Sequence, residues 1–153
     1  VFLICTNTMH KVAAEVQAAV NIPMIHIADA TAKGLIAGGI TKVGLLGTAF
    51  TMQQEFYKGR LTSEFGIEVL VPNTEQQVMV HEVIYQELCL GEINLDSKQK
   101  YLEVIQDLYN QGAQAVILGC TEITLLVQQK DTQVPLYDTT AIHAQSAVAV
   151  ALG

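Results

Sequence analysis

The sequence predicts an α/β protein built on a doubly wound parallel sheet. Segments typical of strands and helices alternate along the whole of the 153-residue chain. The strand-like segments are continuous apolar runs, which are typical of parallel strands covered by helices on both faces. The length suits one compact domain with a sizeable core, or part of a two-domain protein.

The first elements are identified by apolar runs and by the residues that end them. Val1–Ile4 is predicted to be a buried strand, and His10–Val20, with alanine and valine at helical spacing, a helix. Pro23 opens a short extended piece. Asp29–Ala37 is predicted to be a helix because two glycines follow it directly.

The middle of the chain repeats this alternation. Lys42–Thr48 is a strand bounded by glycine, and Thr51–Phe65 has the composition of a helix. The run at 67–72 is the next strand. A helix is predicted over Glu75–Cys89 because apolar residues recur there every three or four positions.

The last elements complete the pattern. Asp96 or Ser97 is expected to cap a helix that runs to Gln111, and Gly112 ends it. The remaining elements alternate as before: a strand at 113–119, a helix at 122–129, a strand at 134–138 and a helix at 141–152. Ligands of such sheets collect at the carboxyl ends of the strands.

Composition excludes several classes of function. The net charge is −7 and Arg60 is the single arginine, which argues against a nucleic-acid partner. No apolar run is long enough to cross a membrane, and the first five residues are too short for a signal peptide, so a cytoplasmic location is predicted. Three cysteines without a CxxC spacing, and four histidines without a helical pair, predict neither disulfides nor a metal site.

Two segments of the chain echo each other. The first is "ICTNTMH" and the second "GCTEITL", and each places a Cys-Thr turn after an apolar run and before a helix. Each then leads to an apolar-Pro-apolar strand and another helix. Cys5 and Pro23 are 18 positions apart, and Cys120 and Pro135 are 15 apart. We interpret this as a weak internal duplication whose two strand ends would meet at one cleft.

Two weak acids that face each other across a cleft suit one reaction: removal of a proton from one face of a carbon and its return to the other. A thiol, with a pKa of about 8.5, can serve as either base or acid. The helix start beside Cys120 is expected to lower the pKa of this thiol. Asn7, Thr8 and Thr121 are candidates for holding a carboxylate. The alternative is that the cysteines are packing residues and the threonines are helix caps.

The motifs "CTNTMH" at Cys5–His10 and "GCTEI" at Gly119–Ile123, with "VGLLGTxxT" at Val43–Thr51 between them, resemble the aspartate/glutamate racemase family. The resemblance covers nearly the whole chain and is closest to the bacterial L-aspartate/glutamate racemase group. It implies a racemase that acts on acidic amino acids with two bases, no cofactor and no metal. It also implies two pseudo-symmetric α/β domains with the active site between them, and a homodimer.

The resemblance also implies a domain division. Residues 1–22 and 132–153 are expected to be a remnant of the first racemase domain, and 23–131 the complete second domain. The chain begins inside a predicted strand, so an upstream part is expected to be missing. Some substrate contacts would lie in that part.

The first motif departs from the family pattern by one position. The family places its catalytic cysteine directly before Asn-Thr, whereas here Thr6 precedes Asn7 and Cys5 lies one residue earlier. One register places Thr6 at the catalytic position with Cys5 pointing away, since a shift of one residue reverses the side-chain direction. The other register needs a bulge that brings Cys5 into the site. We prefer Thr6, because moving Cys5 would displace the contacts of Asn7 and Thr8.

The resemblance then assigns roles residue by residue. Cys120 would remove the α-proton of the L enantiomer, and Thr6 would donate a proton from the opposite side. The predicted substrate-binding residues are the polar members of both motifs: Thr6, Asn7, Thr8, Thr121 and Glu122. The segment 84–89 lacks the lysine that some aspartate racemases carry, which argues against strict selectivity for aspartate. Its Cys89 is assigned to helix packing.

Three other functions fit the same residues. A hydantoin racemase or a maleate isomerase of the same superfamily would use similar thiols on a different substrate. A non-catalytic α/β module would bind a carboxylate without exchanging its α-hydrogen.

Overall fold

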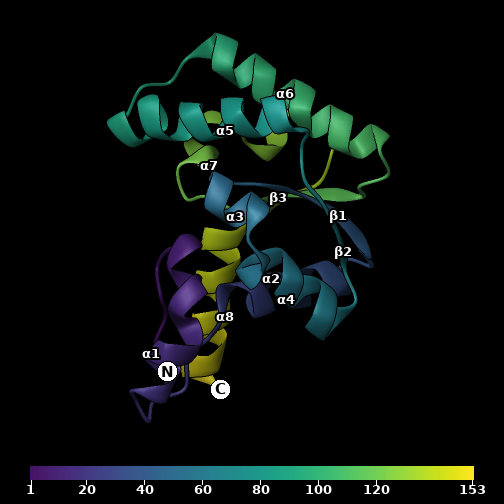
Figure 1. Ribbon diagram of the computed structural model, residues 1–153. Coiled ribbons are helices and arrows are strands. Elements are labelled where there is room, and N and C mark those ends of the chain that lie inside the picture. Colours follow the sequence, from purple (N-terminus) through teal and green to yellow (C-terminus); the bar gives the residue numbers. More distant parts are fainter.

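A computed structural model describes all 153 residues of the chain. Helices and strands alternate through most of it (Figure 1). The elements in order are η1 (Thr8–Val12), α1 (Ala13–Ala18), α2 (Ile27–Ala37), β1 (Lys42–Leu46), α3 (Ala49–Gln53), α4 (Glu55–Phe65), β2 (Glu68–Leu70), α5 (Thr74–Gln86), η2 (Leu88–Leu90), α6 (Leu95–Asn110), β3 (Ala115–Leu118), α7 (Ile123–Leu126), η3 (Gln129–Asp131), β4 (Leu136–Asp138) and α8 (Thr139–Leu152).

The four strands form one parallel sheet in the order β2-β1-β3-β4. The central pair is β1 and β3, and their residues are almost all fully buried. Continuous burial explains why both strands read as uninterrupted apolar runs in the sequence. The predicted α/β class with a parallel sheet is confirmed.

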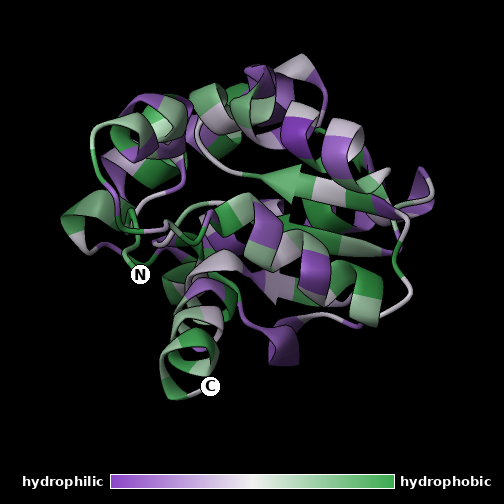
Figure 2. Ribbon diagram, turned by 90° about the horizontal axis from the view of Figure 1, so that it is seen from below, coloured by the Kyte–Doolittle hydropathy of each residue, from purple (hydrophilic) through white to green (hydrophobic).

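Helices cover both faces of the sheet, as the two ribbon views show (Figures 1 and 2). Alternate residues of β3 enter two separate cores. Ala115 and Ile117 pack with residues of α2 and α4, while Val116 and Leu118 pack with residues of α5 and α6. The doubly wound arrangement therefore follows from apolar residues on both sides of each central strand.

Several predicted elements differ from the observed ones. The helix predicted over 122–129 is the four-residue helix α7, with η3 after it, and α6 is capped by Asn94 rather than by Asp96 or Ser97. The predicted strand at Val1–Ile4 is reduced to one isolated bridge, between Phe2 and Met24, because no other segment pairs with it. The helix predicted over His10–Val20 begins as the 3-10 helix η1 and continues as the short helix α1. The helix predicted over Thr51–Phe65 is two helices, since Gln54 between them has an extended backbone.

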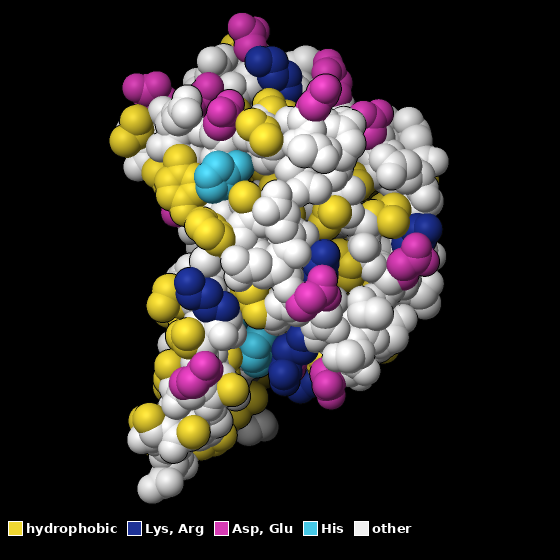
Figure 3. Space-filling view, in the orientation of Figure 1, with side chains coloured by type: hydrophobic (Ala, Val, Ile, Leu, Met, Phe, Trp, Pro, Cys, Tyr) yellow, Lys and Arg dark blue, Asp and Glu magenta, His cyan; other side chains and the backbone are white.

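The two ends of the chain lie together at one side of the molecule. Helices α1 and α8 project below the sheet in Figure 1, and α8 packs against α2. The space-filling view shows a notch between this projection and the main body (Figure 3). The chain has no helix with the length and apolar character needed to span a bilayer.

Candidate active site

A pocket of about 410 Å³ lies at the carboxyl ends of β1 and β3. Both Cys-Thr motifs line it, although they are far apart in the sequence. The lining residues are Cys5, Thr6, Asn7, Thr8, Met9, Thr48, Ile84, Tyr85, Cys89, Gly119, Cys120, Thr121 and Glu122. All six residues that the sequence predicted for the site are therefore brought to one pocket.

Gly119 places the second motif at the end of the sheet. Its N–H donates to the carbonyl of Leu46 on the neighbouring strand, at 2.6 Å. A Cβ at this position would lie 2.7 Å from the same carbonyl oxygen, closer than side-chain carbons pack. Only glycine allows the strands to approach so closely here, and Cys120 follows directly in the turn.

The Cys120 thiol is hydrogen-bonded to a carboxylate. Its Sγ lies 2.9 Å from Oε2 of Glu122, and Oγ1 of Thr121 donates to the same oxygen at 2.7 Å. Burial, and secondly the bond to Glu122, raise the pKa of Cys120 to about 12. Burial opposes ionisation of Glu122 as well, but the two hydrogen bonds hold its pKa below the usual value.

The expected lowering of the Cys120 pKa is therefore wrong. The helix after the motif, α7, has only four residues, so its N-terminus offers little stabilisation to a thiolate. A neighbouring carboxylate disfavours the thiolate, and the sequence already contained this signal in Glu122, two positions after the cysteine.

Hydrogen bonds to threonines elsewhere in the chain hold the polar groups of the first motif. Asn7 is 3% exposed, and its Nδ2 donates to Oγ1 of Thr139 at 3.0 Å. The hydroxyl of Thr8 lies 3.4 Å from that of Thr48, which follows β1. The motif is thus tied to the ends of the sheet rather than lying free on the surface.

Thr6 is positioned through its backbone. Nδ1 of His10 lies 2.8 Å from the Thr6 carbonyl, and Nε2 of His10 lies 3.2 Å from the backbone N of Ile27. Because the Ile27 N–H can only donate, Nε2 accepts and Nδ1 carries the proton. His10 therefore fastens the turn that carries Thr6 to the first turn of α2.

A second histidine packs on the first. The ring centroids of His10 and His26 are 4.5 Å apart, and Nδ1 of His26 accepts from the Ala28 N–H as the cap of α2. Burial, together with the neighbouring His10, lowers the pKa of His26 to about 4. Burial also lowers the pKa of His10. Both rings are neutral at neutral pH.

Two similar backbone hydrogen bonds and two similar helix caps agree with the predicted internal duplication. The N–H of Phe2 donates to the carbonyl of Pro23, and the N–H of Val116 donates to that of Pro135. In each copy the residue three positions after the proline caps the next helix: His26 caps α2 and Asp138 caps α8.

This correspondence defines a register between the copies. Phe2 matches Val116, and the residue four positions later is Thr6 in the first copy and Cys120 in the second. Cys5 would match Gly119 instead. Cys5 itself is exposed and lines the same pocket as Thr6, and also a neighbouring apolar pocket beside α8.

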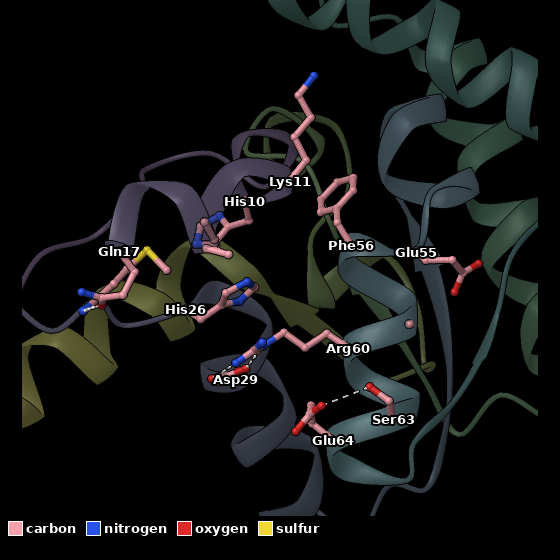
Figure 4. A pocket seen from close by; sticks show the side chains of 14 residues that line it. His10, Lys11, Gln17, His26, Asp29, Glu55, Phe56, Arg60, Ser63 and Glu64 are labelled. Atoms are coloured by element: carbon pink, nitrogen blue, oxygen red, sulfur yellow. Dashed lines mark hydrogen bonds and ion pairs between the residues drawn. The ribbon is translucent and has the colours of Figure 1, made fainter. Parts of the chain in front are cut away.

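A larger hollow of about 700 Å³ lies elsewhere, between η1–α1 and α4 (Figure 4). Its floor carries an ion pair in which Nη2 of Arg60 lies 2.9 Å from Oδ2 of Asp29. Lys11 extends from the opposite wall. None of the predicted site residues lines this hollow, so we place the candidate chemistry in the smaller pocket.

Sequence reasoning missed part of the pocket wall. Cys89, assigned to helix packing, is exposed and lines the pocket, so that all three cysteines of the chain meet there. Tyr85, one turn earlier, lines the same wall. The helical spacing of these two residues could have indicated a shared face, but nothing in the sequence related that face to Cys120. The chain has no group of three or more His, Cys, Asp or Glu side chains placed to hold a metal ion.

Comparisons with known proteins give one consistent result. The family model described as Asp/Glu/Hydantoin racemase matches residues 1–147. The broad specificity amino-acid racemase RacX of Bacillus subtilis is 29% identical over 147 residues, which are 95% of this chain and 62% of RacX.

Solved structures agree with this result. A Yersinia pestis protein provisionally described as an Asp/Glu racemase is 54% identical, with a TM-score of 0.95 over 99% of this chain and 66% of its own. PH1733 of Pyrococcus horikoshii, described as an aspartate racemase homologue, is 37% identical, with a TM-score of 0.88 over the same shares. The chain thus spans about two thirds of the length of these relatives.

Proposed function

This chain belongs to the Asp/Glu/hydantoin racemase family, and from that premise we propose that it carries the two proton-transfer groups of a cofactor-independent racemase of acidic amino acids. One observation carries the proposal: two motifs separated by more than 100 positions line one pocket, and the thiol of the second is already hydrogen-bonded to a carboxylate. Two weak acids in one pocket suit transfer of an α-proton between the two faces of a carbon.

In this mechanism Glu122 first accepts the proton of Cys120. The resulting thiolate removes the α-proton of the L enantiomer. Thr6 donates a proton to the opposite face, through water, and the proton held on Glu122 returns through water to Thr6. The cycle then ends with every group in its starting state. A pKa of about 12 makes the thiolate rare, so its formation is expected to limit the rate, and Glu122 is the group within hydrogen-bond reach that can take the proton.

The backbone register between the two copies supports Thr6 rather than Cys5 as the partner of Cys120. A threonine hydroxyl is a far weaker acid than a thiol, so Thr6 is a poor base for removing a proton. The reaction is therefore expected to begin much faster from the L enantiomer than from the D enantiomer.

The other polar residues of the pocket would hold the substrate. Asn7, Thr8, Thr121 and Glu122 are proposed as its contacts, together with Thr6. We also propose the predicted domain division, with 23–131 as one racemase domain and 1–22 with 132–153 as part of the other. Homodimer formation and a cytoplasmic location belong to the same proposal.

The test is exchange of the α-hydrogen in D₂O, followed by proton NMR with each enantiomer of aspartate and glutamate. Wild type should exchange the L forms much faster, and Cys120→Ser should remove nearly all exchange while the fold is kept. Cys89→Ser is the matched control, because it also replaces a thiol by a hydroxyl in the same pocket. Thr6→Cys should raise exchange from the D forms most.

Three results would contradict the proposal. Equal rates from L and D substrates would exclude the unequal pair of groups. A folded Cys120→Ser variant with full exchange would exclude Cys120 as the base. Exchange with a hydantoin, or isomerisation of maleate, in place of reaction with the amino acids would assign the pocket to another member of the family.

A further inference from the structure

Thr139 joins the two motifs through a buried hydrogen-bond relay. It lies at the start of α8 and is fully buried. Its Oγ1 lies 2.9 Å from the carbonyl oxygen of Leu118, at the end of β3, and 3.0 Å from Nδ2 of Asn7. Cys120 follows Leu118 by two residues, so the relay connects the first motif to the strand that carries the second.

The direction of this relay is fixed by the carbonyl. Because the oxygen of Leu118 can only accept, the Thr139 hydroxyl must donate its one proton there. The same hydroxyl oxygen can then only accept from Asn7. The amide nitrogen of Asn7 must therefore face Thr139, and its Oδ1 is held on the other side of the amide.

Asn7 Oδ1 has no partner within the protein. It is buried without a hydrogen bond, although Asn7 lines the pocket. Leaving a buried acceptor unpaired costs roughly 1–3 kcal/mol, so this atom is available to a donor, either an ordered water or a group that arrives with a ligand. The α-ammonium of an amino acid is a donor of this kind.

From this geometry we infer that Thr139 is a positioning residue of the racemase pocket, which sets the orientation of the Asn7 amide so that Oδ1 receives the ammonium group of the substrate. The inference rests on the proposed function for the identity of the ligand. The orientation of the amide itself rests only on the relay. Thr139 does not touch the substrate and acts through Asn7.

Two variants separate the hydroxyl from the bulk of the side chain. Thr139→Val keeps the shape and removes the hydroxyl, whereas Thr139→Ser keeps the hydroxyl. In Thr139→Val the amide can turn, and the KM for L-glutamate or L-aspartate should rise roughly tenfold, the value of one buried hydrogen bond. Thr139→Ser should stay within roughly threefold of wild type. A Thr139→Val variant that folds with an unchanged KM, or equal losses in both variants, would overturn the inference.

A second measurement does not depend on turnover. In ¹⁵N-labelled wild type, the side-chain amide protons of Asn7 should exchange with solvent much more slowly than those of the exposed Asn73. Thr139→Val should remove that protection and Thr139→Ser should keep it. Fast exchange of the Asn7 amide in wild type would overturn the relay, whatever the racemase assay shows. Slow exchange with no amino-acid binding would keep the relay and contradict the proposed function.

Discussion

Replacing Glu122 by glutamine should make the Cys120 thiol more reactive and, under the proposed function, should slow exchange of the substrate α-hydrogen. The carboxylate accepts the thiol proton at 2.9 Å and, after burial, is the main cause that raises the pKa of Cys120 to about 12. Glutamine keeps an acceptor of similar size but removes the charge. The thiolate then becomes easier to form, while the group that accepts its proton during catalysis is lost.

The size of the effect on the thiol can be worked out. Burial remains in the variant, so only the part of the rise caused by Glu122 is lost, and each fall of 1 in the pKa increases the thiolate fraction roughly tenfold. The nucleophilicity of a thiolate also falls as its pKa falls, with a Brønsted coefficient of about 0.4–0.5. This reduces each tenfold gain in the thiolate fraction by roughly a factor of three. Alkylation of Cys120 at pH 8 should therefore accelerate, by roughly threefold for each fall of 1 in the pKa.

The assay is iodoacetamide modification followed by mass spectrometry, in a Cys5→Ser and Cys89→Ser background so that one thiol reacts. Glu92→Gln is the matched control, because Glu92 is an exposed carboxylate without side-chain bonds. Glu122→Gln should be alkylated faster than this control and should exchange the substrate α-hydrogen more slowly. Unchanged or slower alkylation would refute the role of Glu122 in setting the thiol pKa.

Two further predictions concern the first motif and the histidines beside it. Cys5→Ala should lower the free energy of unfolding by less than about 0.5 kcal/mol and keep most α-hydrogen exchange, because Cys5 is exposed. If Cys5→Ala folds but is inactive while Thr6→Ala is active, the bulged register with Cys5 in the site is favoured instead. His26 has a lowered pKa in the folded state, so the unfolded chain binds more protons between about pH 4 and 6.5, and stability should fall by about 3 kcal/mol as the pH drops through this range. Urea unfolding across that range should show a shallower fall in His26→Asn, which can still cap α2, and equal slopes would refute this role of His26.

The sheet was predictable because its strands are short, apolar and buried on both faces. Ala115–Leu118 is a continuous apolar run, which favours a buried strand, and Gly119 follows its last residue. The predicted strand at Val1–Ile4 had the same apolar character, but strand formation needs a partner, and only Met24 pairs with this segment. Apolar character can be read from local sequence, whereas pairing depends on what lies beside the segment in space.

The members of the site could be predicted, but their electrostatics could not. Cys120 follows β3 at the sheet edge where ligands collect, as predicted, whereas Thr6 follows a segment outside the sheet and reaches the same pocket because Asn7 and Thr8 are hydrogen-bonded to residues at that edge. The pKa of Cys120 depends instead on which way the Glu122 side chain turns, and on how short α7 is. The spacing places a carboxylate two positions after Cys120, but the direction of the Glu122 side chain and the length of α7 cannot be read from it.

The two Cys-Thr segments share a backbone pattern, in which Thr6 of one segment matches Cys120 of the other. Phe2 and Val116 donate to equivalent proline carbonyls, and His26 and Asp138 cap equivalent helices, so the backbone around Thr6 and Cys120 follows one plan. The side chains beside these two positions differ, however. Glu122, two positions after Cys120, accepts from the thiol, whereas the residue two positions after Thr6 is Thr8, which has no carboxylate. The backbone is therefore similar at the two positions, while the side chains beside them differ. Under the proposed function, reaction from the L enantiomer is expected to be faster than reaction from the D enantiomer.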